Sequence, residues 1–170
     1  MVNDTEQLSA FAERYRAILE HGPVGVFEVH RSGTIRYANA ALAQTAGYAS
    51  PDEMIGNDIN RHYADPTQRE RLWQELADKG AVTDFEVTLV TQAGEERRLI
   101  LAMSAQDDCA RGVCVDVTAL YAKERELETA LELNRRIFEA MPCGVVHVRA
   151  NGSIATANSE ALSVLGLAYD

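Results

Sequence analysis

Seven cysteine and histidine side chains are the first candidates in this chain to hold a metal ion or to attack a substrate. Three are cysteines and four are histidines: Cys109, Cys114, Cys143, His21, His30, His62 and His147. Metal sites need several such ligands at short, recurring spacings, and these residues are scattered. They form no nucleophile–base–acid set, and the sequence has no glycine-rich phosphate-binding loop. We therefore expect no metal site and no catalysis in this sequence.

Charge and composition narrow the class of protein. The net charge of −10 disfavours direct binding of nucleic acid, because that affinity comes from lysine and arginine. No stretch approaches the roughly 20 apolar residues that a membrane span needs, and the polar start has no signal-peptide character. An odd number of cysteines without a pairing pattern is typical of reduced thiols. These features predict a cytoplasmic globular protein without a membrane span.

The elements that would position these side chains begin with a helix. Within residues 1–20, apolar residues at helical spacing predict an amphipathic helix, with a stripe formed by Leu8, Phe11, Tyr15 and Ile18. Alternating residues then predict strands over 24–30 and 34–38. Asn39 stands where it caps a short helix that Gly47 closes.

Two further helices open with a polar cap followed by proline. Ser50 begins one, with Glu53 placed to bond back to the cap, and Asp65 begins another over residues 66–79. The apolar stripe of the longer helix predicts four buried residues: Leu72, Trp73, Leu76 and Ala77.

Three strands follow, each with one apolar face. The residues expected to face the core are Phe85, Val87, Leu89, Leu99, Leu101, Met103, Val113 and Val115. Five strands, with the helices inserted between the second and the third, predict an α+β fold. We expect a five-stranded antiparallel sheet with the helices on one face.

A long helix is predicted over residues 118–141. Its seam positions, some apolar and some polar, follow one another at spacings that alternate between four and three residues, as in a coiled coil. The candidate dimer residues are Leu120, Leu127, Leu131, Asn134 and Phe138. A buried Asn134 would fix the register of the pair at a cost in stability. The alternative is a single amphipathic helix folded back on the sheet.

The sequence also repeats itself at an offset of 119 residues. Identical pairs include Pro23/Pro142, Gly25/Gly144, Gly33/Gly152, Asn39/Asn158 and Gly47/Gly166. This period is too long for a solenoid repeat and is about the length of a small domain plus a connector. We therefore expect one complete module and, from residue 142 to 170, the start of a second.

The order of these motifs resembles the PAS domain, the sensory module of bacterial signalling proteins. The resemblance covers residues 12–118 and restarts near residue 135. It is carried by the run from Gly33 to Ala41 and by the run from Gly47 to Gly56. It ends on Asp116-Val117-Thr118, which is similar to the Asp-Ile-Thr signature at the family's signal exit. The resemblance implies a PAS sheet with an N-terminal flanking helix and a C-terminal signalling helix over 118–141.

PAS domains bind haem, flavin, small metabolites or nothing, in a cavity between the sheet and the helices. The candidate lining residues in this sequence are Phe27, Tyr37, Asn39, Leu42, Met54, Ile59, His62, Trp73, Phe85, Leu101 and Met103. Their mainly apolar character suits either an apolar ligand or a collapsed core.

The resemblance also limits the cofactor. The photoactive flavin branch carries a cysteine in the stretch that corresponds to residues 56–62, where this sequence has none, so a covalent flavin adduct is excluded. Haem is disfavoured because residues 66–79 contain no histidine, although His62 lies just ahead of them. A non-covalent flavin facing Trp73 and Asn57, or a small metabolite, stays open.

Asp116 and Thr118 are the candidates for passing a signal out of the domain. In the family such residues join the last strand to the exit helix, and the aspartate commonly bridges to a basic residue. Their chemistry fits, since threonine caps helix starts and an acidic group favours the positive helix end.

These features predict a sensory module of a multidomain bacterial signalling protein that forms a homodimer through its flanking helices. The output domain of the parent chain would be a histidine kinase or a cyclic-dinucleotide enzyme. The alternative is a ligand-free scaffold whose only task is to hold two chains together.

Overall fold

The computed structural model of this chain describes residues 19, 20 and 22–166. The chain divides into two compact units, with the boundary between Ala119 and Leu120. Each unit has a sheet of its own. The amphipathic helix predicted within residues 1–20 lies outside the described residues, apart from its last two positions.

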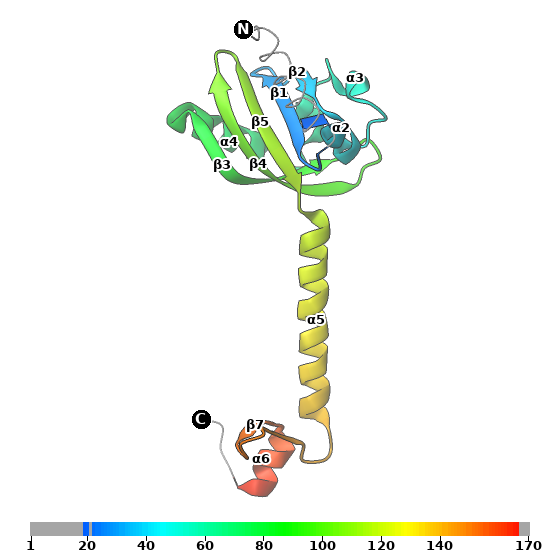
Figure 1. The fold of residues 1–170 in the computed structure, drawn as a ribbon, viewed down its shortest axis with the longest axis vertical. Helices are drawn as coiled ribbons and strands as arrows, with labels where there is room; N and C mark the ends of the chain where they lie inside the picture. Colours follow the sequence, from blue (N-terminus) through cyan, green and yellow to red (C-terminus); the bar gives the residue numbers. More distant parts are fainter. Residues whose placement is uncertain (1–18, 21, 167–170) are drawn as a thin grey trace, which may run out of the picture. The chain divides into compact units, whose positions relative to one another are not determined.

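The first unit contains a five-stranded antiparallel sheet with the strand order β2-β1-β5-β4-β3 (Figure 1). The strands are β1 (Gly25–His30), β2 (Ile35–Ala38), β3 (Ala81–Val90), β4 (Glu96–Gln106) and β5 (Cys109–Asp116). Between β2 and β3 come α2 (Ala40–Ala46), α3 (Pro51–Met54), the 3₁₀ turn η1 (Ile59–His62) and α4 (Pro66–Lys79). The predicted α+β fold is confirmed, and η1 is an addition to it.

Local caps set the helix boundaries, as the sequence predicts. The Ser50 hydroxyl accepts from Glu53 N at 3.4 Å, and Asp65 Oδ1 accepts from Thr67 N at 2.9 Å. The reciprocal bond of Glu53 differs from the prediction, because its carboxylate accepts from Ala49 N at 3.2 Å, one residue before the cap.

The core lies between the sheet and the helices. Its most deeply buried large side chains are Ile35, Met54, Leu72, Leu76 and Leu99. Burying a side chain of this size contributes about 1.5–3 kcal/mol. The buried stripe of α4 is narrower than predicted: Leu72 and Leu76 face the core and Trp73 is half-buried, but Ala77 is exposed because it lies too far around the helix.

One predicted strand face is wrong. On β5 the buried residues are Ala110 and Cys114, whereas Val113 and Val115 are 37% and 43% exposed. Cys114 pairs with Leu101, which places both on the inner face. The inner face of β5 carries small residues and its outer face carries the larger valines, so the hydrophobic pattern predicts the wrong face. A shift of one residue along a strand moves every side chain to the opposite face.

The second unit begins in the long helix α5 (Thr118–Ala140). The strands β6 (Val146–Val148) and β7 (Ile154–Ala157) follow as an antiparallel pair, and α6 (Ser159–Leu165) completes the described residues. The order strand, strand, helix is the one that opens the first unit.

A buried asparagine holds the opening of each unit together. Asn39 Oδ1 accepts from Val26 N at 2.9 Å and from Leu42 N at 3.0 Å. Its Nδ2 donates to Val24 O at 2.9 Å and to Leu19 O. A primary amide offers two donors and a carbonyl oxygen with two lone pairs, so all its positions are used. Asn39 is therefore more than the predicted helix cap.

Asn158 repeats this arrangement in the second unit. Its Oδ1 accepts from Val145 N at 2.8 Å and from Ala161 N at 2.9 Å. Its Nδ2 donates to Cys143 O at 2.9 Å and to Phe138 O at 3.1 Å. Every partner lies 119 residues beyond its counterpart around Asn39, so the sequence repeat is also a repeat of geometry.

We expect Asn39→Ala to lower the free energy of unfolding by about 3 kcal/mol, because buried backbone groups lose their partners. Asn39→Asp tests the hub against the cap. Aspartate caps helices as well as asparagine does, but it places an acceptor against the carbonyls of Val24 and Leu19.

Urea unfolding of the full chain, followed by fluorescence of Trp73, the single tryptophan, measures both variants. The exposed bond of Asn57 makes Asn57→Ala a control expected within about 1 kcal/mol of the native protein. An Asn39→Asp variant within about 0.5 kcal/mol of the native stability would reduce Asn39 to a helix cap.

Candidate functional site

A small apolar cavity lies inside the first unit, between the sheet and the helices. Its volume is about 40 Å³. Seven of the predicted candidates line it: Phe27, Leu42, Met54, Ile59, Trp73, Leu101 and Met103. A bound water needs roughly 10–15 Å³ of such volume, whereas sites for drug-sized ligands measure roughly 300–1,000 Å³. The cavity therefore has room for a very small molecule.

Other lining residues were not among the candidates. They are Val29, Ile35, Tyr63, Leu72, Val87, Leu89, Leu99 and Cys114. The strand alternation contains the signal for Val29, Val87, Leu89 and Leu99, since each shares a face with a candidate. Nothing in the local pattern points to Tyr63 or Cys114.

Four predicted candidates do not line the cavity. Asn39 is committed to backbone groups, and Tyr37 is half-buried on β2. Phe85 is half-buried, with the guanidinium of Arg71 6.0 Å from its ring centre. It follows an irregularity in β3, where Asp84 has a φ of 56°. His62, the fourth, is held elsewhere.

The imidazole of His62 is buried, with both nitrogens occupied. Nδ1 lies 2.8 Å from Val90 O, and Nε2 lies 2.8 Å from the Tyr48 hydroxyl. A carbonyl oxygen only accepts, so Nδ1 carries a hydrogen, and Nε2 is bonded to the Tyr48 hydroxyl. Neither ring nitrogen is free to bind iron.

The two titratable groups that line the cavity are held in their neutral forms. Burial raises the pKa of the Tyr63 hydroxyl to about 12, against the lowering effect of Arg69. Burial and the charge of Asp116 raise the pKa of the Cys114 thiol to about 12, although a hydrogen bond from the Gly25 backbone opposes them. Because the thiolate is the reactive form of cysteine, Cys114 is inert near neutral pH.

Flavin and haem do not fit this cavity. Both exceed its volume, His62 has no free nitrogen, and the Cys114 thiol is protonated.

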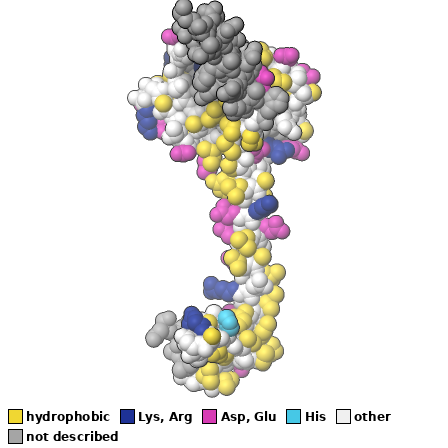
Figure 2. All heavy atoms as spheres, in the orientation of Figure 1, with side chains coloured by type: hydrophobic (Ala, Val, Ile, Leu, Met, Phe, Trp, Pro, Cys, Tyr) yellow, Lys and Arg dark blue, Asp and Glu magenta, His cyan; other side chains and the backbone are white. Residues whose placement is uncertain are grey.

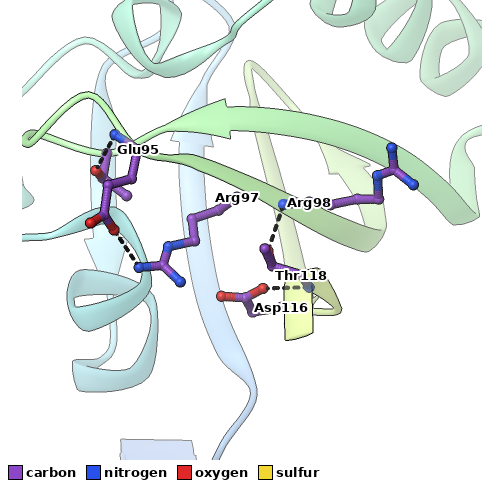
Figure 3. Close-up of polar contacts among 6 residues, drawn as sticks. Glu95, Arg97, Arg98, Asp116 and Thr118 are labelled. Carbon is purple, nitrogen blue, oxygen red and sulfur yellow. Dashed lines mark hydrogen bonds and ion pairs between the residues drawn. The ribbon is translucent and has the colours of Figure 1, made fainter. Parts of the chain in front are cut away.

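The second candidate site is the junction of β5 and α5 (Figure 3). Asp116 Oδ1 accepts from Thr118 N at 2.9 Å, and Thr118 Oγ1 accepts from Arg98 N at 2.8 Å. Val117 N donates to Arg98 O at 2.9 Å. The residue that caps α5 is therefore Asp116, and the Thr118 hydroxyl is bonded to the backbone of β4 instead of capping the helix as predicted.

The expected bridge from Asp116 to a basic residue does not form among the described residues. The neighbouring Arg97 pairs with Glu95 at 2.6 Å (Figure 3). Arg97 and Asp116 line the same open polar groove, together with residues of α2.

Helix α5 carries the predicted seam on its surface. No residue of α5 is buried, and Leu120, Leu127 and Leu131 are 65%, 61% and 60% exposed. Figure 2 shows hydrophobic side chains along this helix. Leu133 and Ile137, outside the predicted seam, are also exposed, and Phe138 is half-buried.

Two further expectations concern the whole described chain. Over the residues that the structure describes, no three histidine, cysteine, aspartate or glutamate side chains are grouped to hold a metal ion. None of the helices in that part of the chain combines the length and the apolar content of a membrane span.

Solved structures share this fold at low sequence identity. A domain of a sensory box histidine kinase/response regulator from Geobacter sulfurreducens is 23% identical, covers 66% of this chain and 99% of its own, and has a TM-score of 0.51. A sensory box histidine kinase/response regulator from Burkholderia thailandensis E264 is 20% identical over 72% and 98% of the two chains, with a TM-score of 0.53.

A third similar structure is the PAS domain, in complex with ethanol, of a LuxR-family transcriptional regulator from Burkholderia thailandensis. It is 17% identical, covers 61% of this chain and 97% of its own, and has a TM-score of 0.52. Among curated proteins, none matches this chain.

Family models match both units. The PAS fold model covers residues 13–130, and a PAS domain model covers residues 132–170. The first match alone spans more than half of the sequence. This chain therefore belongs to the PAS domain family.

Proposed function

We propose that the first unit is a sensory relay that passes a change in its sheet to α5 and, through it, to an output domain of the parent protein. The proposal rests on the hydrogen bonds at the junction of β5 and α5. Arg98 of β4 bonds through its backbone to Val117 and Thr118, and Asp116 of β5 caps α5. A shift of β4 against β5 would break these bonds, and a bonded and a broken junction would then be the two states of the relay.

The cavity size bears on the input. A volume of about 40 Å³ supports a very small apolar molecule, or a signal delivered by a protein partner, and disfavours a large cofactor. The relatives named above include histidine kinases and a transcriptional regulator. Those names support an output domain such as a histidine kinase. A cyclic-dinucleotide enzyme stays an alternative, and we propose no catalysis for this chain itself.

The second candidate function is a ligand-free scaffold. The small volume of the cavity favours it, because incomplete packing of a core also leaves an apolar cavity of this size. In that case α5 would hold two chains together without passing a signal. The relay differs from the scaffold in requiring that the junction and α5 respond to each other.

We expect the purified chain to carry no chromophore. Native mass spectrometry should give the mass of the polypeptide or of its dimer alone, and the absorption spectrum should lack flavin and haem bands. Protein unfolded in acid and scanned for released small molecules provides the control. A flavin or haem retained through purification would contradict the inference that the cavity is too small for these cofactors.

We expect Asp116→Ala to loosen the start of α5 and to leave the sheet intact. The cap contributes about 1 kcal/mol, so amides 118–121 should exchange faster while those of β4 do not. Asp116→Asn is the matched control, since asparagine caps equally well. Hydrogen exchange of the full chain measures both. Unfolding of the Asp116→Ala variant would assign the residue a purely structural role.

We expect the Leu127→Lys/Leu131→Lys double variant to turn a dimer into a monomer, because lysine at seam positions opposes pairing. Ala122 and Thr129 lie on the opposite side of the helix, so Ala122→Lys/Thr129→Lys adds the same charge away from the seam. Sedimentation velocity compares the two. A native chain that is monomeric, or a dimer that survives Leu127→Lys/Leu131→Lys, rules out pairing through this seam.

A further inference from the structure

The C-terminal end of α5 is bonded to the rest of the second unit. Asn158 Nδ2 donates to Phe138 O at 3.1 Å, in the last turn of the helix. Ser159 N donates to Glu139 Oε2 at 3.0 Å, and the Ser159 hydroxyl donates to the same oxygen. Hydrogen bonds to a carboxylate are stronger than those between neutral groups. Backbone and side-chain bonds thus hold the last turn of α5 against the start of α6.

The connector between α5 and β6 has little freedom. Gly144 lies so close to α6 that a Cβ at this position would stand 2.9 Å from Ala161 Cα. The neighbouring Val145 N donates to Asn158 Oδ1 at 2.8 Å. The side chains of residues 141–144 are exposed, and it is the backbone of residues 144 and 145 that the second unit holds, in contrast to a flexible linker.

The repeat places the start of the second PAS unit inside α5. The two family matches begin at residues 13 and 132, which differ by the same 119 residues as Asn39 and Asn158. The first match runs to residue 130, well into the helix. The same offset pairs Leu8 with Leu127 and Ile18 with Ile137. The first family match therefore ends, and the second begins, within this one helix.

One of the differences between the two units bears directly on this joint. Glu20 and Glu139 correspond, but Ala40 stands where the second unit has Ser159. Alanine offers no hydroxyl. The bond from the Ser159 hydroxyl to Glu139 is thus an addition to the shared asparagine hub, placed where the long helix ends.

We propose that Glu139 and Ser159 are positioning residues that lock the end of α5 to the second PAS unit, so that a change in the helix moves that unit instead of being absorbed at residues 141–145. The proposal rests on the proposed relay and extends it to the receiving end. A rigid joint is needed because a helix transmits rotation only to something fixed to it.

The test is a double-mutant cycle on the full chain, read by hydrogen exchange in residues 145–166. Asp116→Ala perturbs the start of α5, and Glu139→Ala or Ser159→Ala opens its end. We expect Asp116→Ala to change exchange in 145–166 by about fivefold or more, and either variant at the joint to abolish that response. Ser159→Ala recreates the residue native at position 40, which keeps the test valid if Glu139→Ala unfolds the second unit.

Two controls separate positioning from simple stability. Glu139→Gln keeps an oxygen acceptor for Ser159 and should show the response of the native background. Glu160 is exposed in the first turn of α6, next to Ser159, and Glu160→Gln should leave the response unchanged. A response that survives both Glu139→Ala and Ser159→Ala overturns the lock and leaves the relay standing. Absence of any response to Asp116→Ala in the native background overturns the relay, and the lock with it.

Discussion

The structure depends on a buried side-chain amide that must satisfy all its hydrogen bonds in a dry interior. Asn39 does so with the carbonyl oxygens of Leu19 and Val24, and with backbone N–H groups at the start of β1 and in the first turn of α2. Asn158 repeats the solution. Since an unsatisfied buried polar group costs about 1–3 kcal/mol, one residue fixes three segments relative to one another.

Polar contacts of this chain are concentrated where one element joins the next. Inside the first unit, the His62 imidazole is fully bonded, and Tyr63 and Cys114 keep their protons at neutral pH. At the edge of this unit, Asp116 and Thr118 join two strands to a helix, and at the far end of that helix Glu139 meets Ser159. The chain thus places its polar contacts where elements join.

Features set by neighbours in the sequence were predictable, and those set by packing were not. The caps Asn39, Ser50 and Asp65 and the alternation in β1 follow from a few adjacent residues. The face of β5 does not, because the choice between Val113 and Cys114 depends on the register with β1 and β4. The same limit applies to the cavity. Seven apolar candidates line it, but Tyr63 and Cys114 arrive there through long-range contacts, and Asn39 was assigned to it although the backbone claims its amide.

We infer that the chain is mechanically continuous from α5 through the Asn158 hub into the rest of the second unit. Backbone ¹⁵N relaxation of the full chain measures this directly at residues 138–146. We expect order parameters of about 0.85 throughout, as in rigid backbone, with no minimum at the joint. Values below about 0.6 at residues 141–145 would show a flexible hinge and contradict it.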